Sequence, residues 1–80
     1  METRIVVDHT RESFYGGYIF YRIEAHTNYL LNGQPQERWL TASEVTEGRE
    51  QLELKLATHP KTCLVYWPPD HPENAKCDLK

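Results

Sequence analysis

The sequence predicts a small α+β domain, an antiparallel sheet of four or five strands with one helix packed across one face. Two observations predict this class. Residues 18–31 alternate between apolar and polar side chains, as a half-buried antiparallel strand does. Residues 47–57 contain no β-branched side chain, which favours a helix. Because 52–56 also alternates as a strand would, an all-β small barrel is the alternative.

Length and charge limit the function classes. Eighty residues form a single domain, 1–80, whose core has little volume to spare for a deep substrate cavity. The net charge of −3, from nine basic and twelve acidic residues, lacks the basic excess of a generic nucleic-acid binder. The apolar run Ile5–Val7 is far too short for a signal peptide or a membrane span, so we expect a cytoplasmic protein without membrane contact.

The first half of the chain predicts strands. Thr3–Asp8 is the first, and the polar stretch His9–Ser13 interrupts it before a turn or bulge at Gly16 and Gly17. The next strand, Tyr18–Leu31, would extend about 45 Å at ~3.3 Å per residue, so a compact domain requires a bulge near residues 24–26. Its odd-numbered residues are predicted to face the core: Ile19, Tyr21, Ile23, Ala25, Thr27, Tyr29 and Leu31.

A hairpin turn is predicted at Asn32-Gly33, leading into a strand over Gln34–Leu40. A two-residue loop would place Trp39 opposite His26, whereas a three-residue bulged loop would place it opposite Ala25 on the buried face. We favour the bulged loop, because burial of a tryptophan removes more apolar surface. Pro35 donates no hydrogen bond, so this strand is predicted either to lie at an edge or to have its start outside the sheet.

A helix is predicted after the capping box Thr41–Glu44, ending at His59-Pro60. One stripe of this helix is apolar. The predicted core combines that stripe with strand residues: Ile19, Tyr21, Ile23, Val45, Leu52, Leu56 and Val65.

The C-terminal stretch predicts a closing hairpin between strands at 62–67 and 75–79. Prolines and turn residues separate the two strands. The residues that form this structural turn are Tyr66, Pro68, Pro69, Asp70 and Pro72. Pairing about Asp70-His71 would place Cys77 opposite Leu64, so the sequence predicts two separate buried thiols at Cys63 and Cys77.

The spacing Tyr66-x-x-Pro69-x-x-Pro72-x-x-Ala75-x-Cys77 resembles the closing motif of an uncharacterised bacterial domain family, often found in membrane-anchored proteins. That family ends in a strand, a Tyr-x-Asp-Pro-x-x-Pro turn and a short last strand. The resemblance implies the strand order described above, over about three quarters of the chain. It implies no activity, because the family has none established.

Three functions are compatible with the sequence. We expect a non-catalytic domain without cofactor or metal that binds a protein partner or forms a homodimer, with Tyr18, Phe20 and Arg22 in the interface. Single-stranded nucleic-acid binding by the same face is one alternative. A small hydrolase or metal protein around His71 is the other, although the set His59, Cys63, His71 and Cys77 has no close pair of zinc ligands.

Overall fold

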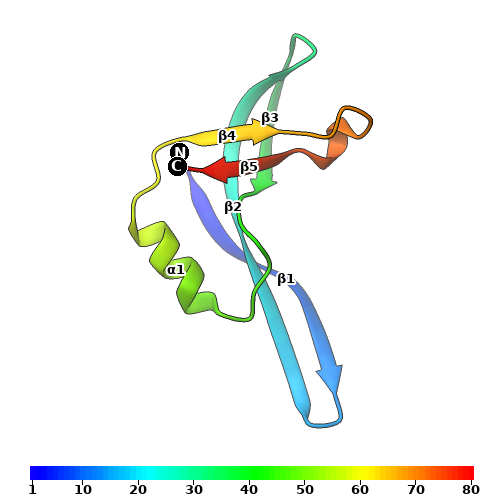
Figure 1. Cartoon of the computed structure of the whole chain (residues 1–80), viewed down its shortest axis with the longest axis vertical. Coiled ribbons are helices and arrows are strands. Elements are labelled where there is room, and N and C mark those ends of the chain that lie inside the picture. The colour runs from blue at the N-terminus through cyan, green and yellow to red at the C-terminus, as the bar shows by residue number, and fades with distance from the viewer.

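The computed structural model describes residues 1–80 as five strands, one α-helix and one short 3₁₀ helix (Figure 1). The elements are β1 (Thr3–Ser13), β2 (Gly16–Leu31), β3 (Gln34–Thr41), α1 (Arg49–Ala57), β4 (Cys63–Tyr66), η1 (Pro72–Asn74) and β5 (Lys76–Leu79). The sheet order is β1-β2-β3-β5-β4. An α+β domain is therefore confirmed, but the sheet is mixed, because β3 and β5 run parallel where Thr41 meets Lys76.

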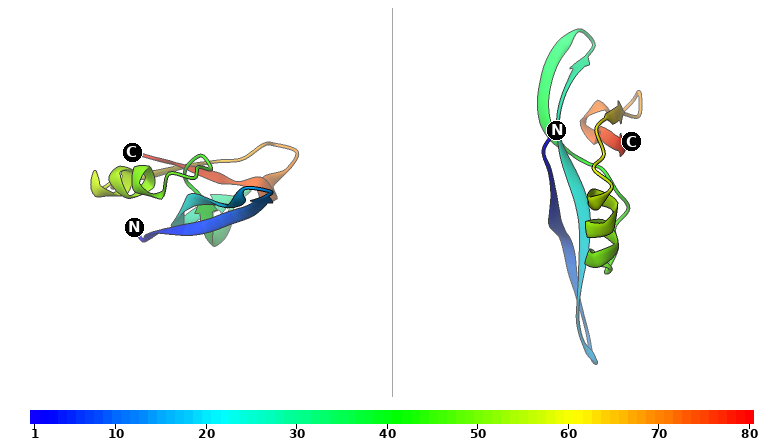
Figure 2. Two further views of the ribbon diagram at one scale, coloured as in Figure 1. Left: turned by 90° about the horizontal axis from the view of Figure 1, so that it is seen from below. Right: turned by 90° about the vertical axis from the view of Figure 1, so that its left-hand side faces the viewer.

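The molecule is elongated, measuring 49 × 30 × 15 Å, and the β1–β2 hairpin runs along its length (Figures 1 and 2). The expected bulge at residues 24–26 of β2 is wrong. The register instead shifts in β1, between Val7 and His9, and leaves Asp8 outside the ladder. The long strand needs no bulge of its own because the domain is not compact. Residues 9–13, expected to interrupt the first strand, belong to β1 and pair with β2 up to Gly16.

The turn at Asn32-Gly33 is confirmed, with φ of 50° and 81° at its two residues. It is a two-residue loop, so Trp39 lies opposite His26 and the expected bulged register is wrong. Leu40 takes the buried position opposite Ala25. The shorter loop wins because both central residues accept positive φ, and Trp39 finds cover on the other face.

The helix is shorter than expected, beginning after Gly48 instead of near the capping box. Thr41 belongs to β3, and the Ser43 hydroxyl accepts a hydrogen bond from the Ile23 N–H at 2.8 Å. Thr46 forms a bridge to Tyr21. These partners on β2 hold the chain extended, so tertiary contacts override the local capping signal. No helix in the structure is long and apolar enough to cross a membrane.

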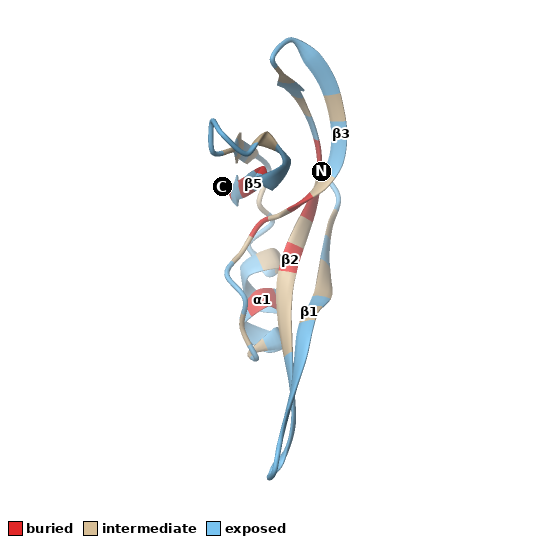
Figure 3. Ribbon diagram, turned by 90° about the vertical axis from the view of Figure 1, so that its right-hand side faces the viewer, coloured by how far each residue is buried: buried red, intermediate tan, exposed pale blue.

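The core lies where β2, β3, α1 and β5 meet (Figure 3). Its buried apolar residues are Ile23, Ala25, Leu40, Ala42, Leu52, Ala75, Cys77 and Leu79. Ile23 and Leu52 were predicted correctly, while Tyr21, Leu56 and Val65 are partly buried against the core. Ile19 and Val45 are exposed, so their predicted burial is wrong. They lie toward the distal part of the β1–β2 hairpin, beyond the end of β3.

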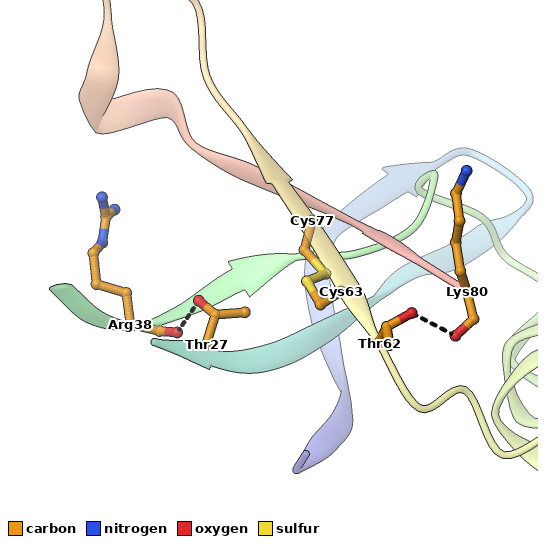
Figure 4. The surroundings of a disulfide bond; sticks show 6 residues. All are labelled: Thr27, Arg38, Thr62, Cys63, Cys77 and Lys80. Atoms are coloured by element: carbon orange, nitrogen blue, oxygen red, sulfur yellow. Dashed lines mark hydrogen bonds between the residues drawn. A yellow bond between two sulfur atoms is a disulfide. The ribbon is translucent and has the colours of Figure 1, made fainter. Parts of the chain in front are cut away.

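Cys63 and Cys77 form a disulfide with 5.5 Å between their Cα atoms, so the prediction of separate thiols is wrong (Figure 4). The hairpin pairs Cys77 with Val65 instead of Leu64. A slip of one residue moves a side chain to the opposite face. In the observed register, Cys63 and Cys77 therefore share a face of the β4–β5 hairpin and can be bridged.

Candidate interaction surface

The distal part of the β1–β2 hairpin, residues 9–20, projects beyond the rest of the sheet and is called the arm below (Figures 1 and 2). Its two-residue tip is made of aromatic side chains. Phe14 is 97% exposed and Tyr15 is 91% exposed. The Ser13 hydroxyl donates to the Gly16 carbonyl at 2.9 Å and accepts from the Tyr15 N–H at 3.3 Å, which fixes the turn. The arm therefore presents two rings to solvent at a defined position.

Two of the expected interface residues lie on the arm, and the third lies at its base. Tyr18 is exposed, and Phe20 is partly buried. The Phe20 ring stacks on His9 of β1, with 4.5 Å between ring centroids and 9° between the planes. Because even-numbered residues of β2 point away from buried Ile23, these rings occupy the face opposite the core.

Arg22 lies at the base of the arm in a network of ion pairs. Its guanidinium contacts Asp8 at 2.9 Å and Glu24 at 3.1 Å, and Glu24 also receives Arg4 at 2.8 Å. The hydrogen bond with His9, followed by the contacts with Arg22, holds the pKa of the Asp8 carboxyl below its ordinary value of 3.8. Arg22 is therefore held by two carboxylates and joins the two strands where Asp8 bulges.

The same face continues onto β3 through Trp39, so the predicted position of Trp39 on the buried face is wrong. The guanidinium of Arg4 lies 3.9 Å from the centre of the indole ring, and the ring of His26 lies 5.2 Å away. A cation over the face of an indole is a favourable arrangement. The Asn32-Gly33 dipeptide carried the signal, because its two-residue loop places Trp39 opposite His26.

The predicted turn residues form the loop between β4 and β5, with Tyr66 ending β4 and Pro72 opening η1. The His71 N–H donates to the Pro68 carbonyl at 3.0 Å, which closes a turn around Pro69 and Asp70. The ring of His71 lies 3.0 Å from the Glu73 carboxylate on the exposed loop.

The four residues considered for zinc do not converge on one point. Cys63 and Cys77 are bonded to each other, and no three His, Cys, Asp or Glu side chains are placed to share a metal ion. A groove between residues 41–46, α1 and β5 is lined in part by Ser43, whose hydroxyl is of the kind that can serve as a nucleophile. That hydroxyl accepts from the Ile23 N–H and donates to the Glu44 carbonyl, so its role here is structural.

Comparisons with protein-family models, with curated proteins and with solved structures found no match to this chain. The resemblance of the closing motif to the bacterial domain family therefore stays a prediction.

Proposed function

We propose that this protein is a non-catalytic module that acts by binding protein through the arm and the outer face at its base. The exposure of Phe14 and Tyr15 is the observation that carries the proposal. Large aromatic side chains are enriched in protein interfaces relative to the rest of the protein surface. Folding of the domain gains nothing from leaving both rings in water at the end of a hairpin.

The rest of the domain would then hold the base of the arm in a fixed position. We propose that α1 covers the core face of the sheet, anchored by Leu52, so that the opposite face stays available to a partner. The ion pairs of Arg22 with Asp8 and Glu24 would fix the base of the arm. Because the base is already fixed, the arm loses less conformational entropy when it binds a partner.

Site-specific photo-crosslinking in cells tests this proposal. A photoreactive phenylalanine analogue replaces Phe14 in one variant and Leu54, an exposed residue of α1, in the matched control. We expect a discrete cross-linked protein band from position 14 and none from position 54. Equal labelling at both positions, or no band at either, would contradict a binding role for the arm.

The nucleic-acid alternative has less support, because Arg22 is already neutralised by two carboxylates and one face of Phe20 is covered by His9. A base could stack on Tyr18, but a basic groove that follows a phosphate backbone is what such binding also needs. Salt-dependent binding of a single-stranded oligonucleotide would restore this alternative.

The hydrolase alternative around His71 rests on a single imidazole beside Glu73 in an exposed loop. Catalysis would also require a nucleophile converging on that imidazole, and the Ser43 hydroxyl is committed to the backbone of Ile23 and Glu44. Turnover in a screen of ester and phosphoester substrates that is lost in His71→Ala would support it.

The cytoplasmic location expected from the sequence now depends on the disulfide. Disulfides form and persist in oxidising compartments and are rare in a reducing cytoplasm. Thiol trapping of the protein from intact cells separates the two cases. Alkylation of Cys63 and Cys77 would support a cytoplasmic protein with open thiols, whereas resistance to alkylation would place it in an oxidising compartment.

A further inference from the structure

We propose that the partner of the arm is the arm of a second copy of this chain, joined β2 to β2 in antiparallel register about a twofold axis at Tyr18. This inference rests on the proposed function and names the partner. A two-stranded ribbon is marginally stable at best in water by itself, and independent stability requires three or more strands with a hydrophobic face. Dimerisation would convert two arms into one four-stranded ribbon.

The free backbone groups of β2 identify the edge that pairs. The N–H and C=O of Tyr21 bond to Thr46, at 2.8 and 3.0 Å, and the C=O of Ile23 accepts from Ala42 at 2.8 Å. Backbone groups alternate in direction along a strand, so those of Gly17 and Ile19 point to this same side. Because β3 ends at Thr41, no strand lies there, and each arm leaves two donors and two acceptors free on this edge.

The opposite edge of the arm is protected against such pairing. The outer edge of β1 carries the bulge at Asp8 together with charged residues, including Arg11 and Glu12. Bulges and charges are the devices by which edge strands avoid association. The β2 edge, Gly-Gly-Tyr-Ile-Phe over residues 16–20, has no charge, no proline and no bulge.

The register follows from which groups are already used. An axis at Tyr18 pairs Gly17 of each copy with Ile19 of the other, and all four free groups of each copy are then bonded. An axis at Ile19 would set Gly17 against Tyr21, whose groups already bond to Thr46. With the axis at Tyr18, residues 16–20 of one copy pair with residues 20–16 of the other along the open edge. The hairpin turn of the second copy then lies next to Tyr21, where the bridge to Thr46 begins.

This register also fits the side chains. On the outer face the two Tyr18 side chains lie next to each other, and on the other face Ile19 lies over the bare backbone of Gly17 of the second copy. Phe14 and Tyr15 reach the neighbourhood of exposed Val45 in the second copy. The paired strands bring no like charges into opposition. Because the interface is small, we expect a weak, concentration-dependent dimer.

Cysteine cross-linking tests the register directly. Residues facing each other across a non-hydrogen-bonded pair lie about 4.5 Å apart at Cα, within disulfide range. We therefore expect Tyr18→Cys to form a covalent dimer under mild oxidation. Arg11→Cys is the matched control, since it lies beside Tyr18 on the same face but on β1, so that both β2 strands separate it from its counterpart in the second copy. Cross-linking by neither variant, or by both to the same extent, would overturn the proposed pairing.

Proline substitutions test the edge without changing charge. In Ile19→Pro the lost N–H is free in the monomer but bonded in the dimer, so we expect the dissociation constant to rise at least about tenfold. Thr10→Pro removes an N–H that points outward from β1, and we expect unchanged dimerisation. Sedimentation over a range of concentrations measures both, and circular dichroism verifies that each variant folds.

The outcome of these tests is distinct from that of the proposed function. A strict monomer at all concentrations, with no cross-linking of Tyr18→Cys, would overturn the self-pairing. If photo-crosslinking from position 14 still captured a different protein in that case, the binding role of the arm would stand and only its partner would change. Loss of both results would overturn both.

Discussion

The two antiparallel hairpins of this protein are held in opposite ways. The β4–β5 hairpin has strands of four residues each, is bridged by a disulfide and buries Cys77 and Leu79 in the core. The β1–β2 hairpin has strands of 11 and 16 residues, and beyond Tyr21 these strands pair only with each other. The disulfide and the buried side chains therefore stabilise the short hairpin. The long one exceeds what the core can cover, which is why we propose that it binds a partner.

The largest difference between the two regions should appear along β2 itself. Ile23 is fully buried, whereas Ile19, four residues away on the same face, is 46% exposed. Ile23→Ala should lower the free energy of unfolding by about 2–5 kcal/mol, because it leaves a cavity in the core. Ile19→Ala should cost less than about 1 kcal/mol in the monomer. Urea denaturation of dilute protein measures both, and similar losses would show that the arm is part of the cooperative core.

Opening the disulfide should have the next largest effect. Cys63 and Cys77 are 14 residues apart, and closure of a loop of that length stabilises a protein by about 3 kcal/mol in the chain-entropy model. Cys63→Ala combined with Cys77→Ala should therefore lower the melting temperature markedly, while the reduced wild-type protein should behave in the same way. An unchanged melting temperature in both the variant and the reduced protein would show that the disulfide does not stabilise the fold.

This contrast also explains what the sequence could and could not predict. The alternation along 18–31 and the Asn32-Gly33 turn are local signals. The strand and the position of the turn were predicted correctly, whereas the bulge in the strand and the length of the loop were not. The burial of Ile19 was predicted wrongly, because periodicity identifies a face but not how far along a strand other elements cover it. The helix start was missed because Ser43 and Thr46 bond to β2.

The candidate surface was predicted in part, for similar reasons. Tyr18, Phe20 and Arg22 were selected from the even-numbered face of β2, where the structure places them. The contribution of Asp8 and His9 depends on a bulge in β1, whereas the predicted bulge was in β2. The disulfide depended on a hairpin register that differed by one residue from the expected one.

A smaller effect should separate the base of the arm from its tip at low pH. The pKa of Asp8 is lowered in the folded protein, so its contribution to stability is present above the ordinary value of 3.8 and is lost as pH falls through the folded pKa. Asp8→Asn should remove this part of the acid dependence. A double substitution of Phe14→Ser and Tyr15→Ser at the tip should leave it unchanged. Denaturation midpoints measured between pH 5 and pH 2, a range of about three units around that value, provide the comparison.

We expect the removal of metal ions to have no effect on stability. Cys63 and Cys77 are bonded to each other, and we assign no structural role to a metal ion near His59 or His71. Added chelator should therefore leave the melting temperature of the oxidised protein unchanged. A decrease that zinc reverses would contradict this expectation and return these four residues to consideration as ligands.

Hydrogen exchange along β2 tests the central claim, that the arm is an unsupported extension of a stable body. In dilute protein we expect the amide of Ala25 to exchange only on global unfolding, and those of Tyr18 and Phe20 to exchange much faster through local opening of the arm. The amides of Gly17 and Ile19 should have almost no protection until the concentration is raised, when pairing of two arms protects them. Uniform protection from residue 17 to residue 27 in dilute protein would contradict the account.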